Sequence, residues 1–259
     1  MPRRLEIATL LYHDVTDDPT QSGIQRRSAL RYKQSQNTFD SHLKQIAASG
    51  LTPGLVVDID FAGTGRRLLL TFDDGGKSAL HVGDSLCAQG WKGHFFVTTG
   101  FIGHRTFLDA GGIRYLRSCG HIVGTHSHTH PDIFRGLALH KMVDEWRISC
   151  QVLSEILGEA CSVGSVPGGD VSAAVFESAA SAGLRYLFTS DPHLQPEKSG
   201  GCWILGRACA TAETTAGELR RLVHFDGWTR IHTVHQSKKL LKVVFSPLYS
   251  LYVDRTTRQ

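Results

Sequence analysis

The chain has 259 residues, 41% of them hydrophobic and 20% charged, which is ordinary for a globular protein with one sizeable core. Its formal net charge is +4, but the stretch from residue 230 onward carries six basic residues and one acid, so the remainder has a net charge of −1. A nearly neutral body argues against a nucleic-acid-binding protein, and no apolar run reaches the roughly 18 residues of a membrane span.

The N-terminus and the cysteines both favour a cytoplasmic protein. The first residues lack a long apolar segment and a small-residue cleavage site, so we expect no signal peptide. None of the six cysteines are in CxxC spacing, which argues against a zinc ribbon or a thioredoxin motif. We therefore expect reduced, buried thiols.

Strand-like and helix-like segments alternate along the chain. We predict strands at residues 7–12, 68–72, 94–98, 121–125, 162–166, 186–189 and 203–208. We predict helices at residues 39–48, 78–89, 113–119, 139–157, 172–182 and 216–223. This alternation is typical of an α/β protein with a parallel sheet, whose chemistry lies at the C-terminal ends of the strands.

Two adjacent carboxylates end the second predicted strand. Asp73 and Asp74 follow the apolar run 68–72, although Asp is depleted in strands, and Gly75 lets the backbone turn so that both can reach one site. Two carboxylates that lie so close repel each other unless a cation neutralises one of them. This stretch therefore indicates a metal.

Histidines that follow the strand at 121–125 can supply the remaining ligands. His126 and His130, four residues apart, can converge on one cation, and Asp74 would complete a set of two imidazoles and one carboxylate with positions open for water. We expect His128, which lies between them, to point away and to have a structural role.

These two motifs resemble those of a known family. Thr-Phe-Asp-Asp-Gly at 71–75 and His-Ser-x-x-His-Pro at 126–131 are similar to the first two motifs of the polysaccharide deacetylases, the NodB-like carbohydrate esterase family 4. The resemblance covers roughly residues 5–210. It implies a distorted (β/α) barrel of seven or eight mostly parallel strands.

The resemblance also implies a reaction. One divalent metal ion, usually zinc, would be held by Asp74, His126 and His130, and a metal-bound water would attack an N-acetyl group of an amino sugar or polysaccharide. Asp73 would be the general base. Backbone N–H groups near Gly168 or Gly169 would hold the oxyanion.

The sequence departs from the family pattern at two places. The third motif usually carries an Arg two residues before its Pro, where this chain has Ser165. Arg207 is a candidate to replace that charge from another strand, although an Arg at the edge of the core that pairs elsewhere is the alternative. The late Leu-x-His motif is also missing, but Tyr-His-Asp-Val at 12–15 resembles that of a permuted subgroup, which makes His13 the candidate general acid.

We expect residues 1–229 to form the catalytic domain and residues 230–259 to form a basic amphipathic tail. Lysines are mixed with apolar residues at 238–245, so the tail either packs on the outside of the barrel or closes one end of it, or contacts an anionic membrane surface. The expected partner is an N-acetylated saccharide, in the cytoplasm or at the inner face of the membrane.

Other readings of the same residues remain open. Adjacent carboxylates do not suit a glycosidase, whose two acids must flank the scissile bond. A carbohydrate-binding pseudoenzyme on the same barrel remains an alternative, because a fold alone does not give a function. A deformylase or another amide hydrolase would carry the same motifs, and the sequence specifies neither the sugar nor the oligomeric state.

Overall fold

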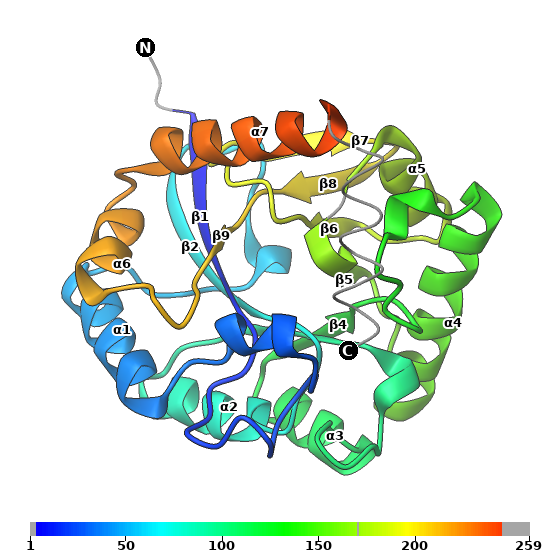
Figure 1. Ribbon diagram of the computed structural model, residues 1–259, viewed down its shortest axis with the longest axis horizontal. Coiled ribbons are helices and arrows are strands. Elements are labelled where there is room, and N and C mark those ends of the chain that lie inside the picture. The colour runs from blue at the N-terminus through cyan, green and yellow to red at the C-terminus, as the bar shows by residue number, and fades with distance from the viewer. Residues whose placement is uncertain (1–3, 170, 245–259) are drawn as a thin grey trace.

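A curled sheet of nine strands forms the centre of the computed structural model, which describes residues 4–169 and 171–244 (Figure 1). The strands lie in the order β7-β8-β6-β5-β4-β3-β2-β1-β9, and within the described residues only β7 pairs antiparallel. Their bounds are β1 Leu5–Tyr12, β2 Gly65–Phe72, β3 His94–Val97, β4 Ile122–Thr125, β5 Val163–Ser165, β6 Tyr186–Phe188, β7 Glu197–Ser199, β8 Cys202–Leu205 and β9 Ala208–Cys209. The arrangement is the distorted (β/α) barrel that the sequence predicts.

Helices surround the sheet on its outside (Figure 1). Their bounds are α1 Gln36–Ala48, α2 Ala79–Ala88, α3 Ala110–Ser118, α4 Leu139–Leu157, α5 Ala173–Ser181, α6 Ala216–Val223 and α7 Trp228–Val244. Short 3-10 turns occupy Arg27–Tyr32, Val56–Asp58, Thr99–Phe101, Phe134–Gly136 and Pro167–Gly169. None of the helices in the described part of the chain is both long and apolar enough to span a bilayer.

One stretch of chain joins the two ends of the curled sheet. β8 pairs with β6 near one end of the sheet, and β9, which begins after two intervening residues, pairs with β1 at the other end. The single strand predicted at 203–208 is therefore divided between the two ends of the sheet. Gly206 and Arg207 lie at the split. Gly206 has no room for a side chain, because a Cβ atom there would lie 2.4 Å from the carbonyl oxygen of Asp191. We call residues 202–209 the seam.

Side chains that alternate along β2 belong to two different apolar clusters. Leu68, Leu70 and Phe72 of β2 belong to the cluster that packs beneath the surrounding helices. Leu69 belongs to a second cluster, shared with Phe96 of β3 and other strand residues, that fills the barrel. Because successive side chains point to opposite faces, Thr71 and Asp73 continue the inward row of Leu69.

The last described helix, α7, begins where the predicted tail begins and contacts the barrel. Ile231 packs against the main core cluster, the ring Nδ1 of His232 lies 3.1 Å from the carbonyl oxygen of Pro192, and His235 pairs with Asp191 at 2.6 Å. This first part of the tail is thus joined to the barrel. Residues 245–259, the rest of the tail considered for membrane contact, lie outside the described residues.

Candidate active site

The ends of neighbouring parallel strands bring the candidate residues together. β1 and β2 pair in register so that Tyr12 lies beside Phe72, and the amide of Asp73 donates to the carbonyl of Tyr12 at 2.9 Å. His13 and Asp73 therefore leave the sheet side by side, and His126 follows β4 at the same edge.

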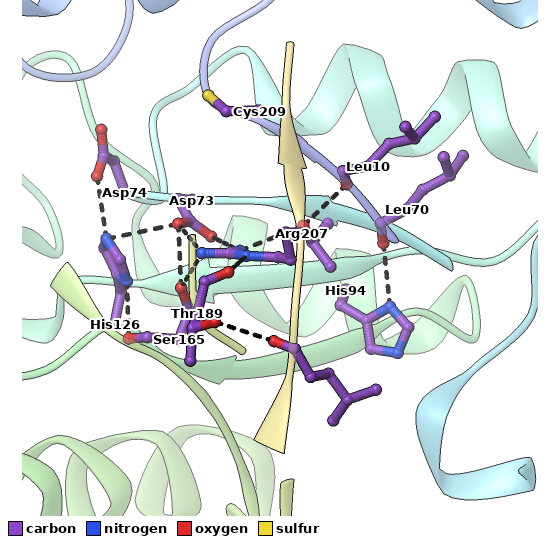
Figure 2. A network of polar contacts seen from close by, with 12 residues as sticks. Leu10, Leu70, Asp73, Asp74, His94, His126, Ser165, Thr189, Arg207 and Cys209 are labelled. Carbon is purple, nitrogen blue, oxygen red and sulfur yellow. Dashed lines mark hydrogen bonds and ion pairs between the residues drawn. The ribbon is translucent and has the colours of Figure 1, made fainter. Parts of the chain in front are cut away.

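Asp73 lies in a buried network centred on Arg207 (Figure 2). The guanidinium of Arg207 donates through Nη1 to Oδ1 of Asp73 at 2.8 Å and through Nη2 to Oδ2 at 2.9 Å. The hydroxyl of Ser165 donates to the same Oδ2 at 3.0 Å. Bidentate pairs of this kind combine strong attraction with fixed orientation.

Arg207 is held from all sides and is fully buried. Its Nε donates to the carbonyl of Thr189 at 2.8 Å, Nη1 to the hydroxyl of Thr71 at 3.2 Å, and Nη2 to Ser165 Oγ at 2.7 Å. The family pattern places a positive charge at position 165. In this chain Arg207, which lies in the seam, supplies that charge to Asp73. Because these bonds point Arg207 at the base, it is not placed to contact a substrate or an oxyanion.

The surroundings keep Asp73 ionised. Burial by itself raises the pKa of its carboxyl, but the charge and hydrogen bonds of Arg207, with His126 beside it, outweigh burial and hold that pKa below its usual range. Asp73 is therefore a carboxylate able to accept a proton.

Three further side chains form a compact set of metal-type ligands. Oδ1 of Asp74 lies 3.4 Å from Nε2 of His126 and 3.6 Å from Nε2 of His130, and the three ligand atoms lie within 4.8 Å of one another. Nδ1 of His126 lies 3.0 Å from the carbonyl oxygen of Ser165, so Nδ1 carries the hydrogen and Nε2 presents a lone pair. Nδ1 of His130 is buried and has no hydrogen-bond partner among the described residues.

The protonation states of Asp74 and His130 suit a cation, whereas a cation would have to displace a proton from His126. Burial lowers the pKa of His126, but the carboxylates of Asp73 and Asp74 outweigh burial and raise it. Burial raises the pKa of Asp74, but its hydrogen bond to His126 and the nearby histidines outweigh burial and lower the pKa well below its usual range. Burial lowers the pKa of His130 to about 4. A carboxylate and a neutral imidazole are the forms that bind metal, so this donor set fits a divalent cation such as zinc.

Backbone strain is concentrated at the same place. Asp74, Ser127 and His130 have φ values of 74°, 64° and 54°, a region that residues other than glycine rarely adopt. Such conformations persist where the surrounding structure enforces them, and they cluster at functional sites. The strain here turns Asp74 away from the inward row of Asp73 and toward the histidines.

Contacts from α4 and from the 3-10 turn Thr99–Phe101 that follows β3 fix the loop that carries the histidines. Oε2 of Glu145 accepts from the amides of His128 and Thr129, each at 2.8 Å. Nδ1 of His128 lies 3.0 Å from the hydroxyl of Thr99, so His128 takes part in the loop rather than in the ligand set. Sequence reasoning missed Glu145, because a glutamate on a helix is most often solvated.

His13 follows β1 directly, beside the end of β2 that carries both carboxylates. Its ring packs against that of Tyr32 in a tilted arrangement, with centroids 4.7 Å apart and an interplanar angle of 31°. Its Nδ1 is buried without a hydrogen-bond partner among the described residues. Tyr32 was missed because it falls between residues 12 and 39, where we predicted neither a helix nor a strand.

Of the two glycines predicted to hold the oxyanion, one is already engaged. The amide of Gly169 donates to the carbonyl of Val166 at 3.2 Å, so it is not free for that role in this arrangement. Gly168 precedes it with a φ of 62°, and its role as an oxyanion donor stays a prediction.

Comparison with protein families identifies part of the chain. Residues 62–187 match the family model described as polysaccharide deacetylase. This match identifies a polysaccharide deacetylase domain within the chain. The chain is thus a hydrolase of carbon–nitrogen bonds. The matched range contains Asp73, Asp74, His126 and His130, whereas Arg207 lies beyond it.

Solved structures agree on the fold. The polysaccharide deacetylase BC0361 from Bacillus cereus has a TM-score of 0.69 at 18% identity, over 84% of this chain and 69% of that chain. IcaB from Ammonifex degensii has a TM-score of 0.71 at 19% identity, over 85% and 98% of the two chains. The Streptococcus pyogenes deacetylase PplD, in complex with acetate, has a TM-score of 0.71 at 17% identity, over 86% and 99%. A comparison with curated proteins gave no match.

Proposed function

We propose that this chain is a metal-dependent deacetylase that removes N-acetyl groups from the amino sugars of a saccharide. The proposal rests on one juxtaposition: the ligand set of Asp74, His126 and His130 lies next to a buried carboxylate, Asp73, that Arg207 orients and keeps ionised. A divalent cation bound there would polarise the amide carbonyl and lower the pKa of a water molecule.

The residues of the chain then divide the proton transfers between them. Asp73 accepts the proton of the attacking water while the new carbon–oxygen bond forms. His13, on the neighbouring strand end, donates a proton to the nitrogen as the carbon–nitrogen bond breaks. The products are acetate and a free amine. Arg207 and Ser165 hold Asp73 in place without contacting the substrate.

Acetate release tests the proposal. Purified protein is incubated with oligosaccharides of N-acetylated amino sugars, with added zinc or with a chelator, and acetate and new amines are measured together. We expect both products in equal amounts with zinc and neither after chelation. Full activity in metal-free protein would contradict the mechanism.

Two controls separate the alternatives. Asp73→Asn should retain zinc and lose turnover by about 10²-fold or more, because it keeps the shape of the base and removes its proton acceptance. Zinc binding without any product from the unchanged protein would instead favour a pseudoenzyme. Formate from N-formylated sugars, with no acetate from acetylated ones, would favour a deformylase.

A further inference from the structure

We infer that Asp14 is a positioning residue that fixes His13 relative to Asp74, an inference that rests on the proposed function. Asp14 follows His13 directly, and its side chain bonds to Ser22 and Ser78 and packs against Gly23 and Gly76. It is 3% exposed, and no role in the proton transfers falls to it.

The carboxylate of Asp14 joins two segments of chain through hydroxyl groups. Its Oδ1 accepts a hydrogen bond from Ser22 of the loop after β1 and another, at 2.9 Å, from Ser78, which precedes α2. The amide of Ser78 donates in turn to Ser22 Oγ at 2.8 Å, and the amide of Val15 donates to Ser78 Oγ at 3.1 Å. These four bonds connect the residues around His13 to the turn that begins at Asp74.

Two glycines make room for this carboxylate. A Cβ atom at Gly76 would lie 2.1 Å from Oδ1 of Asp14, and one at Gly23 would lie 1.8 Å from Oδ2. Gly76 has no positive φ, so close approach rather than backbone conformation explains a glycine there. Asp14 is therefore packed against the backbone two residues after Asp74.

The buried ammonium group of Lys33 also holds the loop that contacts Asp14. Lys33 is 6% exposed and donates to the carbonyls of Pro19 and Ser22 at 2.7 and 2.6 Å, which fixes the loop that carries Ser22. Its charge acts on both Asp14 and Asp74. Removal of the Asp14 carboxylate would thus free the turn after Asp74 and the strand end that carries His13.

The test compares three variants of the full chain loaded with zinc. Asp14→Ala should slow release of acetate from an amide roughly 10–100-fold, the range for groups that orient metal ligands, while an activated acetyl ester, which needs little proton donation, loses less. Asp14→Asn keeps the Oδ1 acceptor for both hydroxyls and should stay within a few-fold of the unchanged protein. Asp18→Ala, a carboxylate in the same loop that bonds to Thr20, should change neither rate.

Zinc affinity, measured by competition with a chromophoric chelator, gives a readout other than activity. We expect Asp14→Ala to weaken it about tenfold or more. A folded Asp14→Ala protein with both rates and zinc affinity within twofold of normal would overturn the inference. So would equal losses on amide and ester with normal zinc affinity. If Asp14→Ala does not fold, Ser78→Ala removes one donor alone, and it should show the same preference for loss on the amide.

If the unchanged protein binds zinc but releases no acetate, the proposed function fails. The zinc affinities of Asp14→Ala and Asp14→Asn then judge the inference separately. Weaker zinc binding by Asp14→Ala together with normal zinc binding by Asp14→Asn supports the inference. Equal zinc affinities of the two variants overturn it.

Discussion

The pair of Arg207 and Asp73 allows a quantitative test of the site. Both side chains are almost fully buried, with exposures of 0% and 2%, and two short hydrogen bonds join them. Arg207→Met would keep most of the side-chain length and leave Asp73 as a buried carboxylate without its cation. Loss of one partner from a buried ion pair typically costs about 3–5 kcal/mol, a large part of the stability of a domain.

The free energy of unfolding of zinc-saturated protein, from urea titrations followed by tryptophan fluorescence, measures this cost. Arg117→Met is the matched control, because Arg117 also bonds to a carboxylate, Glu159, through two nitrogens, but with exposures of 43% and 46%. We expect the control to lose less than about 1 kcal/mol. The double variant Arg207→Met with Asp73→Asn should lose less than the sum of its single changes, because it leaves neither charge buried alone. The reasoning is refuted if Arg207→Met costs no more than Arg117→Met.

Four other predictions concern different parts of the molecule. His13→Ala should slow hydrolysis of amides far more than that of activated esters, and equal losses would point to a defect in folding or metal binding instead. Burial lowers the pKa of His94 to about 4, below its ordinary value of about 6.5. The unfolded chain therefore takes up a proton first at this residue, and His94 alone should contribute a fall of about 2 kcal/mol in the free energy of unfolding from pH 7.5 to pH 5, so that the total fall is smaller in His94→Gln. Removal of the chain after Thr229 should lower Tm, because Ile231 and His235 contact the barrel. For the proposed membrane contact, the full chain should sediment with anionic vesicles at low salt, and protein that stays in the supernatant would contradict it.

Much of the fold follows from local pattern. α4 and α6 begin and end at the predicted residues, since each has an apolar stripe of helical period, and α4 ends at Gly158 in the left-handed conformation that glycine favours. The buried parallel strands are also predictable from the sequence, because short apolar runs bounded by glycine rarely form any other structure. β7 was missed because Glu197–Ser199 is polar and mostly exposed, with no period to detect.

The ligand set could be predicted for a different reason. Asp74 and His126, like the base Asp73, follow the ends of apolar strands, where charged and imidazole side chains are costly unless a site requires them, and His130 lies four residues after His126. Parallel strands place such ends on one edge, so the sequence alone brings these residues near one another. Residues that support the set, such as Glu145 and Asp14, have no comparable signal because their partners are backbone amides and hydroxyls far along the chain.

The position of Arg207 explains why this chain has no arginine at position 165. Ser165 is small and fully buried, and its hydroxyl lies 2.7 Å from the guanidinium of Arg207 that occupies the space beside Asp73. An arginine side chain at 165 would have to enter the same space, and its charge would oppose that of Arg207 without a second carboxylate to balance it. Only the curl of the sheet brings the seam across to Asp73, since β8 pairs with β6 and β9 with β1. The base therefore keeps its cation through a contact between residues 134 positions apart, which no local pattern could specify.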